Sequence, residues 1–119
     1  MKLIVAYIRP ERLTAVKQAL YAQEIFSMTV TNVLGSGRQK GFTETYRGVV
    51  MEVNLLKKVR LEIGVNDSFL DAALKAIETG ARTGREGDGV IFVLDIARSL
   101  RIRTGESDIA AVAATRTAP

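Results

Sequence analysis

The chain has 119 residues, of which 47% are hydrophobic, and a formal net charge of +4 from 17 basic and 13 acidic side chains. This length and apolar content predict one globular domain, and the modest positive charge suits anionic ligands without indicating a dedicated nucleic-acid binder. Cysteine and histidine are absent, which excludes disulfides, thiolate or imidazole metal sites and histidine-based catalysis. The N-terminal apolar run is too short for a signal peptide and no run approaches membrane-spanning length, so we expect a cytoplasmic protein.

The first elements predicted along the chain are a strand and a helix. Residues 3–8 form a short apolar run that Pro10 stops, which is typical of a buried strand. Pro10 then occupies a favoured first helical position. The helix is predicted from the apolar residues that recur at helical spacing after it, namely Leu13, Val16 and Leu20.

One strand is predicted on each side of a long glycine-rich segment. Residues 28–34 are rich in Thr and Val, and residues 59–65 alternate apolar and polar side chains, so that the later strand has one buried face and one face that presents polar groups. The intervening residues 35–58 are too many for a simple connection, which predicts a loop with a function of its own. Its glycines allow positive φ and a close approach of backbone N–H groups to an anion, with added positive charge nearby. These residues are Gly35, Gly37, Gly41, Arg38 and Lys40.

In the second half of the chain, a second helix is predicted, followed by two strands. Asn66 or Asp67 is placed to cap a helix, with Gly84 as its expected stop. Its apolar face consists of Leu70, Ala73, Leu74, Ile77 and Ala81. Residues 90–94 predict a fourth strand and residues 100–103 a short fifth. The resulting order predicts an α+β, ferredoxin-like βαββαβ fold with two helices on one sheet face, followed by a mobile tail over residues 105–119 with room for one helical turn.

Two further segments carry polar chemistry. Residues 83–89 place two glycines around Asp88, a pattern that forms a tight turn or presents N–H groups to phosphate. In a strand, the side chains of Arg101 and Arg103 would point to the same face, about 6.6 Å apart. The two guanidinium groups could then bind one anion that carries several oxygens. The alternative is a solvated edge strand whose charges keep it soluble.

Taken together, these segments resemble the PII signalling proteins, the GlnB and GlnK group. The resemblance rests on residues 28–31, 35–41, 43–48, 58–59, 83–89 and 101–106. It implies a ferredoxin-like domain over residues 1–105, a T-loop at about residues 36–56 and a mobile C-terminal tail over residues 106–119. It also implies a homotrimer that binds ATP or ADP in clefts between subunits and 2-oxoglutarate together with Mg-ATP. Such proteins are regulators rather than enzymes, and their T-loop docks on partners such as the AmtB ammonium channel or enzymes of nitrogen metabolism.

The resemblance assigns roles by position. Nucleotide binding falls to Tyr7, Thr29, Gly35, Gly37, Arg38, Gln39, Glu62, Gly64, Gly87, Asp88, Gly89, Val90, Arg101 and Arg103. Within this set, Thr29 and Glu62 match contacts to the adenine edge, and Arg103 matches a residue that reaches in from a neighbouring subunit. The 2-oxoglutarate site comprises Gly37, Gln39, Lys40, Gly41 and Lys58, with Gln39 also the magnesium ligand. Partner binding falls to Tyr46, Arg47, Val49, Val50 and Met51.

The chain departs from the family pattern at several of these positions. Met51 replaces the uridylylated tyrosine and Val49 the serine phosphorylated in cyanobacterial members, so we expect neither modification. The apolar loop tip favours either a partner patch or packing against the trimer. Val90 replaces a phosphate-binding lysine, so ATP affinity is reduced or nucleotide preference is changed. Tyr7 stands where the family has a smaller residue, and Gly64 stands where valine is common. If the two positions are neighbours, the changes compensate in volume. Alternatively, the Tyr7 ring stacks on the adenine base.

Three other functions are alternatives to this one. The first is a divergent PII-like sensor of AMP, ADP or bicarbonate that regulates a different transporter or a partner in carbon metabolism. The second is an RNA-binding module of the same topology, which needs aromatic platforms that residues 59–65 lack. The third is an enzyme, for which no histidine, cysteine or paired-carboxylate arrangement is available. We therefore expect no nucleic-acid partner.

Overall fold

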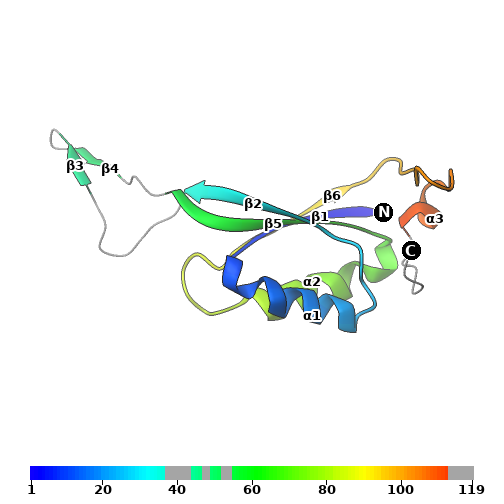
Figure 1. Cartoon of the computed structure of the whole chain (residues 1–119), viewed down its shortest axis with the longest axis horizontal. Helices are drawn as coiled ribbons and strands as arrows, with labels where there is room; N and C mark the ends of the chain where they lie inside the picture. The colour runs from blue at the N-terminus through cyan, green and yellow to red at the C-terminus, as the bar shows by residue number, and fades with distance from the viewer. Residues whose placement is uncertain (37–43, 47–48, 52–54, 113–119) are drawn as a thin grey trace.

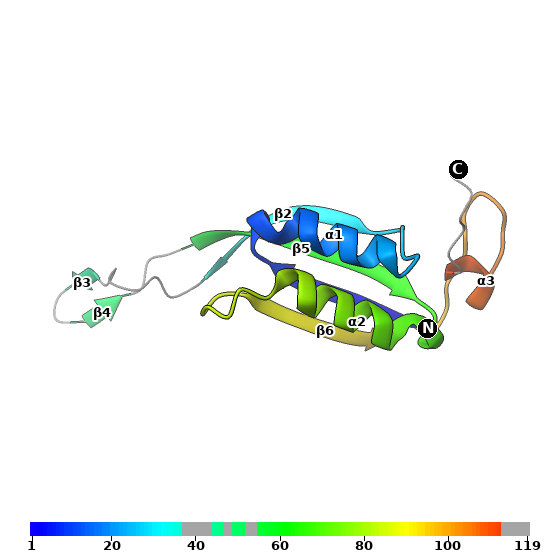
Figure 2. The same ribbon diagram turned by 90° about the horizontal axis from the view of Figure 1, so that it is seen from below.

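The computed structural model describes residues 1–36, 44–46, 49–51 and 55–112. Four antiparallel strands form one sheet, with helices α1 and α2 on the same face of it (Figures 1 and 2). The strands are β1 (Lys2–Ile8), β2 (Thr29–Ser36), β5 (Leu55–Val65) and β6 (Gly89–Asp95), and their spatial order is β2-β5-β1-β6. With α1 between β1 and β2 and α2 between β5 and β6, this is the predicted α+β ferredoxin-like fold.

The core lies between the sheet and the two helices. In β1, Ile4, Ala6 and Ile8 are buried, whereas the residues between them point to the other face. The same alternation buries every second residue of β5 from Val59 to Val65, as predicted. One face of the sheet is therefore covered by helices, and the other carries Tyr7, Lys58 and the remaining alternate side chains.

The first helix begins through a short 3-10 turn, η1 (Pro10–Arg12), which continues into α1 (Leu13–Ala22). Pro10 occupies the first turn, where its missing N–H costs no helical hydrogen bond. Val16 and Leu20 face the core and are fully buried. The expected helix is confirmed, with the α-helical part starting three residues after the proline.

Helix α2 (Asp67–Ala81) packs closely on α1. A side chain at Gly80 would place its Cβ 2.8 Å from Val16 Cα, so only hydrogen fits at this crossing. Asn66 is the N-cap residue, as expected, yet its side chain makes no capping hydrogen bond and instead donates to the Ile109 carbonyl at 3.3 Å. The helix ends at Ala81, before Gly84, which belongs to the loop that follows.

The base of the glycine-rich segment is strand rather than loop. β2 and β5 continue to pair as far as Ser36 and Leu55. Gly35 lies within β2 and is not among the glycines with positive φ, so its expected role as a left-handed loop glycine is wrong. Between residues 37 and 54, strands β3 (Glu44–Tyr46) and β4 (Val49–Met51) pair as an antiparallel hairpin.

The predicted fifth strand at residues 100–103 is also wrong. Leu100 makes an isolated bridge to Ser107, and the chain turns back between them. The Arg101 N–H donates to the Glu106 carbonyl, and the Gly105 N–H donates to the Arg101 carbonyl, each at 2.8 Å. The turn is followed by the short helix α3 (Ile109–Val112). No helix among the described residues combines the length and the apolar character needed to cross a membrane.

Candidate functional site

Asp88 closes the loop between α2 and β6. Its Oδ2 accepts the backbone N–H groups of Thr83 and Gly84, both at 2.8 Å, and its Oδ1 accepts the Thr83 hydroxyl and Arg9 Nε, the latter at 3.1 Å. These hydrogen bonds, led by that from the Thr83 hydroxyl, hold the pKa of Asp88 well below its usual range. The carboxylate is therefore ionised at neutral pH and fixes the loop over residues 83–89.

Two basic side chains, one within β5 and one directly after β1, hold this loop against the sheet. Lys58 Nζ donates to the Gly87 carbonyl at 2.6 Å, and Arg9 Nη2 donates to the Glu86 carbonyl at 2.5 Å. Gly87 and Gly89 have φ of 93° and 111°. A Cβ at Gly89 would lie 1.7 Å from the Tyr7 carbonyl oxygen, so no side chain fits there. The structure thus gives residues 83–89 a tight turn, and their contact with phosphate stays a prediction.

A hollow of about 480 Å³ lies on the uncovered face of the sheet, next to this loop. It is lined by Tyr7, Val33, Leu34, Gly35, Ser36, Lys58, Arg60 and Val90. Tyr7 is paired with Arg60 on one side and Val90 on the other, and its ring meets Phe92 edge-on at 6.4 Å. The fold therefore brings four predicted site residues together in this hollow, namely Tyr7, Gly35, Lys58 and Val90.

Thr29 and Glu62, the predicted contacts to the adenine edge, are directly paired across β2 and β5. Glu62 Oε1 accepts Arg60 Nε at 3.0 Å and also contacts Arg60 Nη2. This hydrogen-bonded ion pair raises the pKa of Arg60. Glu62 thus orients a neighbouring guanidinium on the face that we expected to present chemistry.

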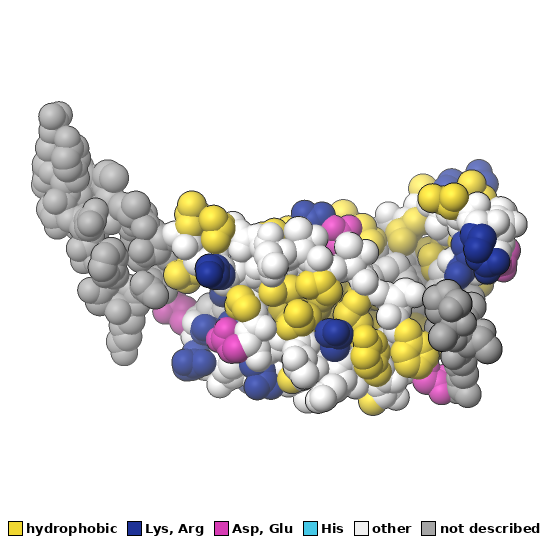
Figure 3. Space-filling model, viewed as in Figure 1, with side chains coloured by type: hydrophobic (Ala, Val, Ile, Leu, Met, Phe, Trp, Pro, Cys, Tyr) yellow, Lys and Arg dark blue, Asp and Glu magenta, His cyan; other side chains and the backbone are white. Residues whose placement is uncertain are grey.

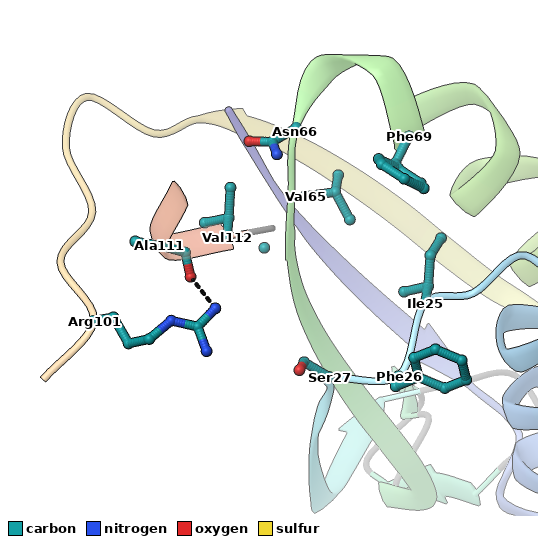
Figure 4. Close-up of a pocket in the computed structure, with 10 residues that line it drawn as sticks. Ile25, Phe26, Ser27, Val65, Asn66, Phe69, Arg101, Ala111 and Val112 are labelled. Carbon is teal, nitrogen blue, oxygen red and sulfur yellow. Dashed lines mark hydrogen bonds between the residues drawn. The ribbon is translucent and has the colours of Figure 1, made fainter. Parts of the chain in front are cut away.

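Arg101 lies beside α3, near the far end of β5 (Figure 4). Gly64 is the penultimate residue of β5 and lines the same pocket. This smaller pocket, of about 150 Å³, is also lined by Ile25, Phe26, Ser27, Val65, Asn66, Phe69, Ala111 and Val112. Arg101 Nη2 donates to the Ala111 carbonyl at 2.9 Å, and a Cβ at Gly64 would lie 3.8 Å from Val112 Cγ1. Arg103 is exposed on the adjoining turn.

The expected compensation in volume between Tyr7 and Gly64 is wrong within one chain. Gly64 is paired with Leu3, whereas Tyr7 is paired with Arg60, so the two residues lie at different ends of the sheet. Gly64 instead leaves room beside α3. Stacking of Tyr7 on a base stays a prediction.

The predicted basic groups also divide between the two ends. Lys58 contacts the loop at residues 83–89, whereas Arg101 lies beside Val65 and Asn66. At about 3.3 Å per residue, the stretch of β5 from Lys58 to Val65 spans on the order of 20 Å. One chain therefore does not bring its own loop and its own Arg101 to one phosphate group.

Several predicted site residues fall outside the described part of the chain. They are Gly37, Arg38, Gln39, Lys40, Gly41 and Arg47. The backbone of β3 and β4 is described, but the side chains of Tyr46, Val49, Val50 and Met51 are not. Their roles in binding magnesium, 2-oxoglutarate or partners stay predictions.

Two basic residues at the site were not predicted from the sequence. Arg60 belongs to the alternating strand pattern, so its place on the polar face was a usable signal. Arg9 follows the first apolar run, and nothing in the local pattern indicates that it reaches Asp88, 79 residues later. Its role depends on a long-range contact.

The uncovered surfaces are partly apolar. On β6, Val90, Phe92 and Leu94 are 48%, 51% and 48% exposed. Figure 3 shows further hydrophobic side chains gathered across the visible face of the molecule. Such surface is typical of a protein that contacts other subunits.

Comparison with known proteins identifies relatives over nearly the whole chain. The model of the family described as "Nitrogen regulatory protein P-II" matches residues 1–106. "Nitrogen regulatory protein P-II" of Klebsiella oxytoca is 52% identical over 112 residues, which cover 94% of this chain and all of the relative. "Nitrogen regulatory protein P-II 1" of Escherichia coli strain K12 has the same identity and coverage. "Nitrogen regulatory protein GlnK1" of Methanosarcina mazei is 49% identical over 109 residues, 90% of this chain and 93% of the relative.

Proposed function

Because this chain belongs to the nitrogen regulatory protein P-II family, we propose that it binds adenine nucleotides and signals their identity to partner proteins through its T-loop. In this proposal the protein is a regulator and not an enzyme. It acts in the cytoplasm and is recruited to a membrane when its partner is a channel.

The proposed binding unit is a cleft between two protomers of a homotrimer. The separation of the loop at residues 83–89 from Arg101 along β5 is the observation that supports this arrangement. A neighbouring protomer would supply Arg101 and Arg103 to phosphates held at Gly87 and Gly89. The exposed apolar side chains of β6 would be buried in the same assembly, which favours association.

Each end of the cleft has a proposed role. The turn fixed by Asp88 would present backbone N–H groups to the phosphates, and Thr29 and Glu62 would contact the adenine edge. Lys58 would pair with a carboxylate of 2-oxoglutarate, exchanging its bond to the Gly87 carbonyl for a charged partner. Magnesium bound with ATP and held through Gln39 would neutralise charge where phosphates and keto acid meet.

The T-loop would transmit the ligand state to an ammonium channel of the AmtB type or to an enzyme of nitrogen metabolism. Arg47 is the proposed plug residue, and the apolar residues Val49, Val50 and Met51 form the proposed contact patch. Methionine at position 51 has no hydroxyl group, so uridylylation at this position is chemically impossible. Control would therefore rest on ligands.

Native mass spectrometry and calorimetry on the full chain test this proposal together. We expect a trimer that takes up three ADP or ATP molecules, and 2-oxoglutarate binding that requires Mg-ATP. A monomer that takes up no adenine nucleotide at millimolar concentration would contradict the proposal. Equal 2-oxoglutarate affinity with and without Mg-ATP would remove the keto acid from it.

The second candidate is a sensor of another small molecule, such as AMP, ADP or bicarbonate, that regulates a different transporter or a partner in carbon metabolism. Its support is the unusual wall of the hollow, where Tyr7 and Val90 lie side by side. A thermal-shift comparison of ATP, ADP and AMP, each with 2-oxoglutarate or bicarbonate, separates the two. The response to 2-oxoglutarate must exceed that to bicarbonate if the first proposal is correct.

A further inference from the structure

We propose that Arg60 is an anion-binding residue of the nucleotide site and supplies, from β5, the positive charge that Val90 cannot supply from β6. This inference rests on the proposed nucleotide function and adds a residue to it. The ligand class is a phosphate group of an adenine nucleotide.

The register places Arg60 and Val90 on either side of the same tyrosine. Tyr7 is paired with both residues, so the three lie in one row across β5, β1 and β6. Strands are about 4.8 Å apart, which separates the backbones of positions 60 and 90 by roughly 10 Å. Both residues line the hollow of about 480 Å³, and a long arginine side chain on one side can serve the same space as a lysine on the other.

The charge in this hollow comes from β5. Among its lining residues, Lys58 and Arg60 are the two that carry a charge. Lys58 Nζ is engaged by the Gly87 carbonyl, where it holds the loop. Arg60 is 40% exposed, so its guanidinium is accessible from the hollow.

Glu62 orients the Arg60 guanidinium for this role. The contacts to Glu62 Oε1 use Nε and Nη2, which form one edge of the planar group. A guanidinium has five N–H donors, so the two-nitrogen end formed by Nη1 and Nη2 keeps donors for a second anion. Arginine binds phosphate oxygens in this paired manner. Glu62 is therefore a positioning residue for Arg60, in addition to its proposed contact with adenine.

Calorimetric titration of ADP into the full-length protein tests the inference. Arg60→Gln is expected to weaken ADP binding about 10- to 100-fold, the effect of losing one charge-assisted contact. Lys57→Gln is the matched control, because it removes one positive charge from the same strand, three residues before Arg60 and on the opposite side of the sheet. Lys57→Gln should leave ADP affinity within about threefold of the parent chain.

A lysine at position 90 provides the rescue. Val90→Lys should restore most of the lost affinity in the Arg60→Gln background and have a smaller effect in the parent chain, because the two cations serve one phosphate. Equal gains in both backgrounds, or no loss in Arg60→Gln, would overturn the inference. Light scattering of each variant shows whether the assembly stays intact. An Arg60→Gln protein that dissociates, and whose ADP affinity Val90→Lys does not restore, would also overturn the inference. Failure of the parent chain to bind ADP would instead contradict the proposed function.

Discussion

Asp88 holds the shape of the loop at residues 83–89 through four hydrogen bonds. Its carboxylate accepts two backbone N–H groups, the Thr83 hydroxyl and the Arg9 side chain. An amide at this position would replace one accepting oxygen by a donor that faces other donors. The loop conformation thus depends on the negative charge of the Asp88 carboxylate.

This charge gives a prediction about pH. The pKa of Asp88 is lower in the folded chain than its usual value near 3.8, so the ionised group stabilises the fold above that value. The stabilisation is lost as pH falls below it. We expect Asp88→Asn to melt at a lower temperature than the parent chain at pH 7, and the difference to shrink as pH falls toward 3.

Thermal melts across this pH range measure the effect. Asp71→Asn, at an exposed position on α2, is the control and should follow the parent chain at each pH. A melting difference between Asp88→Asn and the parent that does not change with pH would contradict the role of the Asp88 charge.

Gly89 gives a second prediction at this scale. Gly89→Ala places a methyl group 1.7 Å from the Tyr7 carbonyl and must separate β6 from β1. Gly105→Ala is the matched control, since Gly105 also has positive φ, at 75°, but a Cβ there meets nothing within 4 Å. The control should cost about 1 to 2 kcal/mol of backbone strain. We expect Gly89→Ala to lower the free energy of unfolding by clearly more, as urea denaturation would measure.

At the scale of elements, the crossing of α1 and α2 depends on the missing side chain at Gly80. Alanine usually stabilises a helix by about 1 kcal/mol relative to glycine. At this position its Cβ would approach Val16 Cα to 2.8 Å, so the helices must move apart. We expect Gly80→Ala to destabilise the protein by about 1 to 3 kcal/mol in urea denaturation, because overpacking outweighs propensity.

The neighbouring exposed residue supplies the control for this prediction. Thr79→Ala on the outer side of α2 should be neutral or slightly stabilising. If Gly80→Ala were also stabilising, the close contact between the helices would not exist as described.

The elements that sequence patterns predicted well are those with a local cause. The alternation from Val59 to Val65 and the helical spacing of Ala73 and Ile77 are set by burial on one face, and the structure confirms both. The extension of β2 and β5 to Ser36 and Leu55 was missed because each strand is completed by the other, across the intervening residues. Such pairing leaves a weak local signal.

The errors have the same physical origin. Residues 100–103 show an alternation typical of an edge strand, but the chain folds back there. The Arg101 N–H donates to the Glu106 carbonyl, and the Gly105 N–H donates to the Arg101 carbonyl. The compensation between Tyr7 and Gly64 fails within one chain, because it required a register that local patterns do not contain. Part of the candidate site was predictable through resemblance, whereas the contacts of Arg9 and Arg60 required the fold.

For the whole molecule, the uncovered sheet face predicts assembly. Phe92 is 51% exposed and packs edge-on against Tyr7 on the face without helices. Phe92→Asp would place a charge within the proposed apolar contact between protomers, which is unfavourable without a partner. We expect this variant to shift from trimer toward monomer in light scattering.

A change of equal charge elsewhere controls for net charge. Thr79→Asp lies on the outer side of α2 and should leave the trimer intact. A Phe92→Asp protein that remains as trimeric as Thr79→Asp would place the subunit contact on another surface.

Mixing two defective variants tests the shared site most directly. Arg101→Gln removes a side chain from the α3 end, and Lys58→Gln removes one from the loop end. If each site takes these residues from different protomers, neither variant alone should bind 2-oxoglutarate with Mg-ATP at parental affinity. Calorimetry on trimers reassembled from an equal mixture should then recover one parental site per mixed trimer. Mixed trimers that recover no binding would contradict a site built between subunits.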